Sequence, residues 1–147
     1  MNRGRICLYV AVVATLVGGV VTVADAMVIT DEERLETFVE TLTSKGGDRV
    51  GHALRFTDPN REPVAVVSQG GPDRFADGQE VELESAMRNA LSAFSARELD
   101  TVQRAVDIRG EQAMVALRVR GDEGLTNAQF DFRRHDDGWL LQRVVVR

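Results

Sequence analysis

The sequence predicts an α+β domain in which helices come first and an antiparallel sheet follows. Before Leu99, hydrophobic residues recur at helical spacing in two long segments, and after it they alternate with a period of two. Glycine-containing turn signals divide the second part into four segments of strand length. Because helices and strands are segregated along the chain, we expect N-terminal helices and one long helix packed on a sheet that ends in a four-strand meander.

Three helices are predicted before the meander. The first covers about residues 30–45, and its apolar stripe consists of Leu35, Phe38, Val39 and Leu42. A short helix is expected near residues 50–54. The longest helix is predicted over residues 80–94, with Asp77 and Glu80 placed to cap its start. The apolar positions of this longest helix are Leu83, Met87, Ala90, Leu91 and Phe94.

The strands are predicted from short apolar runs and from alternation. VAVVS at residues 64–68 indicates a strand, whereas residues 69–79 have the composition of a loop. The first three strands of the meander are indicated by Val102, Val106 and Ile108, by Val115, Leu117 and Val119, and by Phe130 and Phe132. The fourth strand is residues 139–146, and Asp137-Gly138 forms a two-residue turn before it.

The first 26 residues are predicted to be a signal peptide, which leaves residues 27–147 as the domain. A basic start precedes an apolar run, and residues 24–26 have the A-x-A pattern of a cleavage site. We therefore expect export, to the periplasm or the extracellular space. The alternative is an uncleaved membrane anchor over residues 6–24. Cys7, the only cysteine, lies in this leader, so the cleaved chain has no thiol.

The charge balance disfavours two classes of partner. The formal net charge is -5 and the isoelectric point is about 5.1. A nucleic-acid binder needs a basic surface that displaces counterions from phosphates, so no nucleic-acid partner is predicted. Docking on anionic lipid is disfavoured for the same reason, and a membrane partner is expected only if the leader stays uncleaved.

The order of the elements and the ending FDFRRHDDGWLLQRVVV resemble the nuclear transport factor 2-like superfamily. The resemblance covers nearly all of the chain from about Val28 onward. It implies a curved sheet that wraps a helix into a cone with a pocket at its wide end. Members include ketosteroid isomerases, polyketide cyclases, dehydratases and many non-catalytic binding or accessory domains. The resemblance therefore implies a fold but selects no function.

No pattern in the sequence predicts a catalytic residue, a metal site or a cofactor. The chain has no G-x-S-x-G or H-E-x-x-H motif, and its one tyrosine lies in the leader. His135, Asp136 and Asp137 are interpreted as the exposed tip of a hairpin. His52 with Asp58 is a conceivable metal-binding pair, and Asp58 a conceivable base, although neither belongs to a recognised motif.

Three residues are candidates for ligand binding: Arg104, Arg143 and Trp139. A turn at Asp137-Gly138 places Arg143 opposite Phe132, and therefore on the helix-covered face of the sheet. Arg104 has the same parity as the apolar residues of its own strand. A charge on that face needs a carboxylate such as Glu82, the wet mouth of a pocket, or an anionic ligand. Trp139 is expected to pack against Met87, Leu91 or Phe94.

The same register directs Leu140, Val144 and Val146 away from the helices, together with Met114 and Ala116. Such an apolar patch predicts a homodimer through the sheet face. We therefore expect an exported, non-catalytic domain that binds a small apolar or anionic ligand or serves an accessory role. The alternatives are a small isomerase, cyclase or dehydratase that uses the cone pocket, and a dimeric protein-interaction module.

Overall fold

The computed structural model describes residues 30–68, 70–95 and 99–147, so the predicted signal peptide lies outside the described residues. Within these ranges, no helix is both long and apolar enough to span a membrane. Residues Asp31–Arg147 form one structural unit. The predictions for the domain can be compared with that unit, whereas cleavage and anchoring stay predictions.

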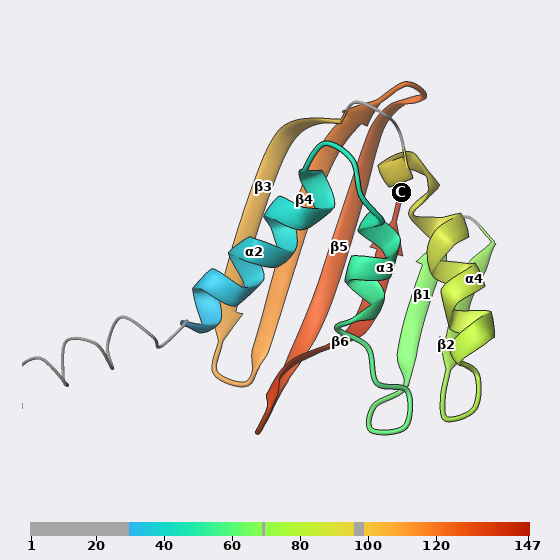
Figure 1. Cartoon of the computed structure of the whole chain (residues 1–147), viewed down its shortest axis with the longest axis vertical. Coiled ribbons are helices and arrows are strands. Elements are labelled where there is room, and N and C mark those ends of the chain that lie inside the picture. The colour runs from blue at the N-terminus through green and yellow to red at the C-terminus, as the bar shows by residue number, and fades with distance from the viewer. Residues whose placement is uncertain (1–29, 69, 96–98) are drawn as a thin grey trace, which may run out of the picture. The chain divides into compact units, whose positions relative to one another are not determined.

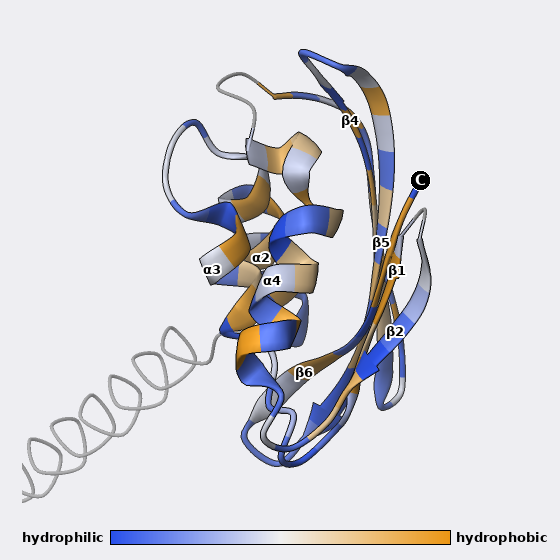
Figure 2. Ribbon diagram, turned by 90° about the vertical axis from the view of Figure 1, so that its right-hand side faces the viewer, coloured by the Kyte–Doolittle hydropathy of each residue, from blue (hydrophilic) through white to orange (hydrophobic). Residues whose placement is uncertain are grey.

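Helices cover one side of a curved sheet in this unit (Figures 1 and 2). They are α2 (Asp31–Thr43), α3 (Arg49–Leu54), α4 (Glu80–Ala90) and the short 3-10 helix η1 (Ser92–Ser95). Figure 2 shows the strands bending around the helices, which therefore occupy the concave side of the sheet. The predicted α+β architecture, with helices packed on one face of a curved sheet, is confirmed.

The sheet has six strands in the order β2-β1-β6-β5-β4-β3. Their bounds are β1 Val64–Ser68, β2 Gly71–Phe75, β3 Asp100–Arg109, β4 Gln112–Gly121, β5 Gly124–His135 and β6 Gly138–Val146. The meander of β3 to β6 is confirmed. The sheet is nevertheless mixed, because β1 pairs with β6 in parallel while every other pair is antiparallel.

The loop prediction for residues 69–79 is wrong for Gly71–Phe75, which form β2. This strand pairs with β1 at the edge of the sheet, where Pro72 lies opposite Val67. An edge strand tolerates proline, because its unpaired side needs no backbone N–H donor. Phe75 is buried and ties the strand to the core. The composition indicated a loop because turn residues are also the residues that an edge strand accepts.

The helix predicted over residues 80–94 is shorter than expected. α4 ends at Ala90 and has 11 residues, so α2 with 13 residues is longer. Leu91 leaves the helical conformation, and the following 3-10 turn directs Phe94 into the core. The helix is also not capped by Asp77, because Gln79 is the N-cap residue and makes no side-chain capping bond.

The core lies between the helices and the concave face of the sheet. The predicted stripe of α2 is buried, with Leu35, Phe38, Val39 and Leu42 all at most 1% exposed. Phe38 lies edge-on to three rings, with centroids 5.0 Å from Phe56, 5.1 Å from Phe130 and 5.0 Å from Phe132. Aromatic pairs in this geometry favour one fixed arrangement, so these rings fill the centre of the curved sheet.

The last hairpin differs from its predicted register in two ways. The turn is Asp136-Asp137 rather than Asp137-Gly138, and Arg134 lies opposite Trp139. Phe132 then lies opposite Leu141, but the register shifts immediately beyond this pair. After the shift, Asp131 lies opposite Arg143 and Phe130 opposite Val144. This irregularity is a β-bulge in β6 at Gln142, the extra residue between the two registers.

The bulge reverses the faces of the residues that follow it. Val144 is fully buried opposite Phe130, and Val146 lies opposite the buried Ala128 and packs against the core, so the predicted outward orientation of both is wrong. Arg143 points to the opposite, helix-free face, so its predicted helix-facing orientation is also wrong. The physical reason is that an inserted residue shifts the two-residue alternation of a strand by one position.

A second bulge lies in β3. The register shifts between Thr101 and Gln103, which removes Val102 from the predicted alternation and leaves it 46% exposed. Arg104 lies opposite Leu117, a buried residue on the helix-facing side. Arg104 is itself exposed, because β3 is an edge strand and a long side chain there can reach water.

Candidate functional site

The structure does not bring the three predicted ligand-binding residues together. Arg104 has the helix-facing orientation at the β3 edge, whereas Arg143 lies on the other face of the sheet. Trp139 is 4% exposed, so its predicted burial is confirmed. Its packing against the long helix and the ligand-binding role of all three residues stay predictions.

The concave interior contains a buried charged residue whose contacts are with backbone carbonyls. Arg49 is the one charged residue that is buried among the described residues. Its guanidinium donates to backbone carbonyls, with Nε 2.9 Å from Ser44 O and Nη1 2.5 Å from Phe94 O. Arg49 therefore holds the segment before α3 against η1, and its contacts are structural.

His52 approaches this interior from α3. Its ring lies 6.1 Å from the ring of Phe38 and 5.5 Å from that of Phe56. Burial, and then the charge of Arg55, lower the pKa of the His52 imidazole. Its Nε2 has no hydrogen-bond partner in the described part of the chain. His52 thus behaves as a neutral ring at neutral pH, and no group of three or more His, Cys, Asp and Glu residues that could hold a metal occurs in that part.

The helix-free face of the sheet, called the outer face below, carries a hollow of about 330 Å³. Its floor is a row across four strands in which Ala105 lies opposite Ala116, Ala116 opposite Gln129, and Gln129 opposite Val145. Small alanine side chains on two neighbouring strands leave space that the longer side chains around them enclose. The hollow is therefore built by the strand register, and we call it the outer groove.

Long polar side chains line the outer groove on both sides of this floor. On one side Gln103 lies opposite Arg118 and Arg118 opposite Asn127. Arg147 continues this row, because its backbone N–H and C=O both bond to Asn127, at 2.9 and 2.8 Å. On the other side of the floor stands Arg143. Three arginines thus surround one hollow.

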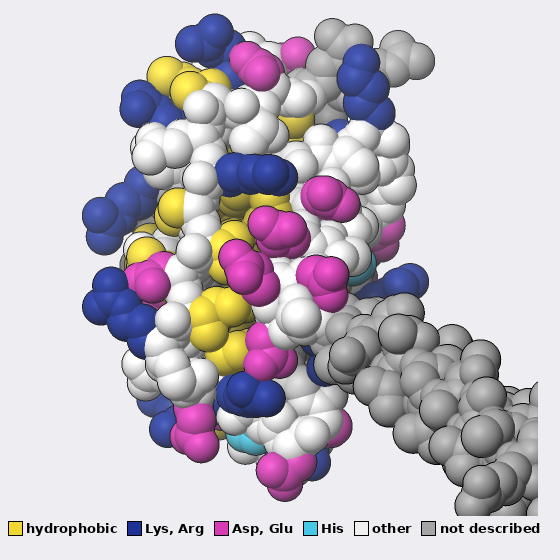
Figure 3. Space-filling view, turned by 90° about the vertical axis from the view of Figure 1, so that its left-hand side faces the viewer, with side chains coloured by type: hydrophobic (Ala, Val, Ile, Leu, Met, Phe, Trp, Pro, Cys, Tyr) yellow, Lys and Arg dark blue, Asp and Glu magenta, His cyan; other side chains and the backbone are white. Residues whose placement is uncertain are grey.

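Within the described ranges, these three arginines have no carboxylate partner. No Asp or Glu of the described ranges lies within 4.0 Å of the charged groups of Arg118, Arg143 or Arg147. Other arginines do form such pairs, namely Arg61, Arg88, Arg109, Arg133 and Arg134. In Figure 3, a view onto the β3 edge, basic side chains gather along the left margin, on the sheet side of the molecule.

A second hollow, of about 390 Å³, adjoins the outer groove on the same face. Its lining includes Asp131 and Asp107, and Asp107 pairs with Arg109 of the same lining at 2.7 Å. Asp131 lies opposite Arg143 in the register, but Gln129 Nε2 donates to its carboxylate at 2.8 Å. One side of the alanine floor is therefore basic, while the other carries charges of both signs.

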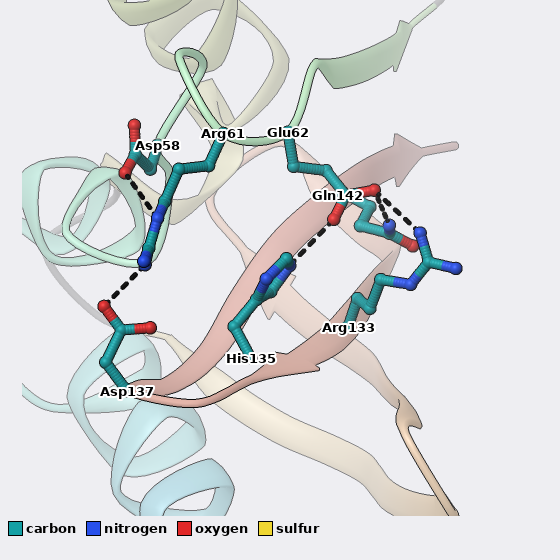
Figure 4. A network of polar contacts seen from close by, with 7 residues as sticks. All are labelled: Asp58, Arg61, Glu62, Arg133, His135, Asp137 and Gln142. Atoms are coloured by element: carbon teal, nitrogen blue, oxygen red, sulfur yellow. Dashed lines mark hydrogen bonds and ion pairs between the residues drawn. The ribbon is translucent and has the colours of Figure 1, made fainter.

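A network of polar contacts centred on Glu62 connects the loop before β1 to the last hairpin (Figure 4). His135 Nε2 lies 2.9 Å and Arg133 Nη1 3.2 Å from the Glu62 carboxylate, and Gln142 Nε2 also donates to it. Burial alone would raise the pKa of Glu62, but the bonds from His135, Gln142 and Arg133 outweigh it, and the pKa is lowered. Glu62 is therefore ionised at neutral pH.

The network explains the His-Asp-Asp sequence. These three residues lie at the tip of the last hairpin, as predicted, with the turn at Asp136-Asp137. His135 and Asp137 also contact the loop before β1. Besides the bond of His135 to Glu62, Asp137 pairs with Arg61 at 2.5 Å. Sequence reasoning could not find this network, since Glu62 and His135 are 73 residues apart and share no motif. It also could not find Arg118, because an exposed arginine in a strand is an ordinary surface residue.

The outer groove is the arrangement best suited to binding. Guanidinium groups donate planar pairs of hydrogen bonds that match carboxylate and phosphate oxygens. The amides of Gln103, Asn127 and Gln129 add donors and acceptors around the same hollow. Nothing in this set is a nucleophile or a base at neutral pH, so its chemistry is recognition.

Comparisons with known proteins support the fold. No protein-family model matches the sequence, and no curated protein is similar enough to match it. Among solved structures, a "putative ketosteroid isomerase" from Parabacteroides distasonis is similar with a TM-score of 0.58 and 14% identity, over 80% of this chain and 86% of that one. A de novo designed protein with a curved β-sheet gives 0.57 and 11%, over 80% and 99%.

A third similar structure carries the name of a fold family. It is described as an NTF2-like protein of unknown function from Cytophaga hutchinsonii, with a TM-score of 0.50 and 11% identity. The aligned part covers 82% of this chain and 91% of that protein. At such low identity the likeness establishes the fold alone.

Proposed function

We propose that this chain, which has the nuclear transport factor 2-like fold, is an exported, non-catalytic domain that binds a small molecule on the outer face of its sheet. The observation that carries the proposal is the outer groove, a hollow of about 330 Å³ with unpaired arginines on two sides. Its volume lies at the lower end of the range for small-molecule sites.

The filled interior supports the non-catalytic part of the proposal. An isomerase of the ketosteroid type needs a base and an oxyanion donor in a pocket that admits the substrate. The rings of Phe38, Phe56, Phe130 and Phe132 pack against one another between the helices and the sheet here, and the nearby imidazole of His52 is uncharged. Binding on the outer face requires no opening of this core.

Export rests on the leader pattern. If residues 1–26 are removed, the exported protein begins at Met27, and N-terminal sequencing of that material would detect this end. A mature product that retains Cys7 would contradict export by cleavage and favour an anchor over residues 6–24.

The binding site can be tested by nuclear magnetic resonance with a library of small acidic, neutral and basic compounds. We expect bound compounds to shift the amides of Ala105, Ala116, Gln129 and Val145. Ala116→Trp, which fills the outer groove, should remove these shifts. The control Val81→Trp changes a residue on α4 that is 78% exposed and should leave binding unchanged. Compounds that instead shift Phe38 and His52, with no effect of Ala116→Trp, would contradict the proposal and favour the enzyme alternative.

A dimeric interaction module is the second candidate, and the charges of the outer face favour it. Arg118 and Arg147 lie on one side of the alanine floor, and Asp107 and Asp131 lie on the other, together with Arg109 and Arg143. A two-fold axis through the floor would place Arg118 and Arg147 of one copy over the side of the other copy that carries Asp107 and Asp131. An isologous interface needs this kind of self-complementarity.

A further inference from the structure

We propose that the ligand of the outer groove is a compact organic anion that carries at least two carboxylate or phosphate groups. This inference rests on the proposed function and specifies the chemical class of its ligand. Three cations indicate an anionic ligand: Arg118, Arg143 and Arg147 line a single hollow, and none of them has a carboxylate partner in the described part of the chain.

Unpaired arginines are unexpected in an acidic protein. The formal net charge is -5, so carboxylates outnumber cations over the chain as a whole. Three neighbouring cations repel one another, and this repulsion is relieved when an anion binds between them. The low-dielectric protein walls of a hollow focus the field of these cations, which strengthens the attraction of an anion compared with a flat surface.

The spacing of the three residues indicates more than one anionic group. Arg118 and Arg147 are two strands apart, which corresponds to about 10 Å between their backbones. Arg143 lies in β6 and Arg147 just past its end, four residues later, so their backbones are roughly 13 Å apart along the strand. One carboxylate has only two oxygens to share among guanidinium groups from three such positions, whereas a di- or tricarboxylate or a phosphorylated acid offers a separate anionic group to more than one of them.

The floor of the outer groove indicates a compact carbon skeleton. Ala105, Ala116 and Val145 offer methyl groups to the centre of the ligand, while Gln129 and Asn127 offer amides to its hydroxyl or carbonyl groups. Inorganic phosphate would leave this floor uncovered. A hollow of about 330 Å³ also excludes long polymers from being enclosed.

The test is a calorimetric titration of the full domain with citrate at low ionic strength, and with fructose 1,6-bisphosphate in a parallel arm. We expect Arg118→Gln and Arg143→Gln each to weaken citrate binding about tenfold, because each removes a charge-assisted bidentate bond. Arg34→Gln is the matched control: it removes the same charge from an exposed side chain of α2, which covers the other side of the sheet. It should change the affinity less than about twofold. Tighter binding of citrate would indicate carboxylate groups in the ligand, and tighter binding of the phosphate compound would indicate phosphate groups.

Two results would overturn the inference. Equal weakening by Arg34→Gln, Arg118→Gln and Arg143→Gln would mean diffuse charge attraction rather than a site. No binding of either anion would also overturn it, and the compound library then separates the two proposals. If neutral compounds still shift the amides of Ala116 and Gln129, the outer groove remains a binding site for uncharged ligands. If no compound shifts them, the proposed function fails as well.

Discussion

Trp139 illustrates how a single side chain contributes to stability here without a polar contact. Its indole is 4% exposed, and its Nε1 has no hydrogen-bond partner among the described residues. The neighbouring Arg134 pairs with Asp31 at 2.8 Å, so the first residues of β6 lie beside the start of α2. The contribution of Trp139 is therefore the burial of a large apolar surface at that junction.

We expect Trp139→Ala to lower the free energy of unfolding by about 3–5 kcal/mol, the usual cost of emptying a buried aromatic site. Trp139→Phe should cost much less, because no hydrogen bond of the indole is lost. Urea denaturation of both variants measures the difference. A loss below about 1 kcal/mol for Trp139→Ala would contradict the burial of this side chain.

Glu62 shows the opposite case, a carboxylate whose stability contribution depends on its charge. Its side chain is 15% exposed, and it receives bonds from His135, Arg133 and Gln142. These bonds lower the pKa of Glu62 in the folded state. The network therefore stabilises the fold at pH values above 4.5, the ordinary pKa of a glutamate. This stabilisation is lost as the pH falls through the lowered folded pKa.

We expect Glu62→Gln to lower the free energy of unfolding at pH 7 by about 1.5–3 kcal/mol, the range for hydrogen bonds to charged groups. The gap between the wild type and this variant should close as the pH falls below about 4.5, when the wild-type carboxylate is protonated. Denaturation curves across that pH range measure it. Glu123→Gln, in an exposed turn, is the control; a gap that persists in acid would contradict the role of the Glu62 charge.

The bulge of β6 is the element on which the outer groove depends. Before it, Trp139 and Leu141 face the helices; after it, Val144 takes that orientation and Arg143 and Val145 face outward. An uninterrupted strand would bury Arg143 and expose Val144. Gln142, the inserted residue, also bonds to Glu62, so the Glu62 network holds the bulge in place.

The two registers make opposite predictions for neighbouring residues. We expect Val144→Asp to cost at least about 4 kcal/mol of unfolding free energy, because it buries an unpaired charge opposite Phe130. Val145 is 7% exposed, but it faces the outer groove, where an introduced carboxylate lies beside Arg143. Val145→Asp should therefore cost clearly less than Val144→Asp, about 2 kcal/mol. Urea midpoints of both variants decide the matter. If Val145→Asp were the more damaging change, the bulge would be absent.

The whole molecule presents one covered and one open face of its sheet. The helices cover the concave side, as Figure 2 shows, while the outer face carries charged side chains on either side of Ala105 and Ala116. Sheets with small residues at the centre can approach closely, and the charges then select the orientation of the partner. The predicted homodimer is thus expected to form through this face.

We expect sedimentation at micromolar concentration to show a monomer–dimer equilibrium that shifts toward the monomer as salt is added, because the contacts are charged. Ala116→Arg should give a monomer at all concentrations tested, whereas Val81→Arg on α4 should leave the equilibrium unchanged. A wild-type protein that sediments as a monomer throughout would remove the dimer from consideration.

The sequence by itself determined the fold class and most of its elements. The stripe Leu35, Phe38, Val39 and Leu42 and the alternation of Val115, Leu117 and Val119 are local patterns, because a helix or strand buries one side of its own residues. The absence of catalytic motifs was equally visible. These properties depend on neighbours in the chain, which is the information that a sequence displays directly.

The tertiary structure alone decided the candidate site. The face of the sheet on which Arg143 lies depends on one inserted residue, Gln142, and no local sequence pattern predicts a bulge there. The convergence of Arg118, Arg143 and Arg147 depends on the register of three strands, and the bond of Glu62 to His135 spans 73 residues. Strand β2 was not predicted because its residues have the composition of a turn, and only pairing with β1 holds them in an extended conformation. Contacts between distant segments form only in the folded chain, since side chains far apart in sequence share no spacing rule.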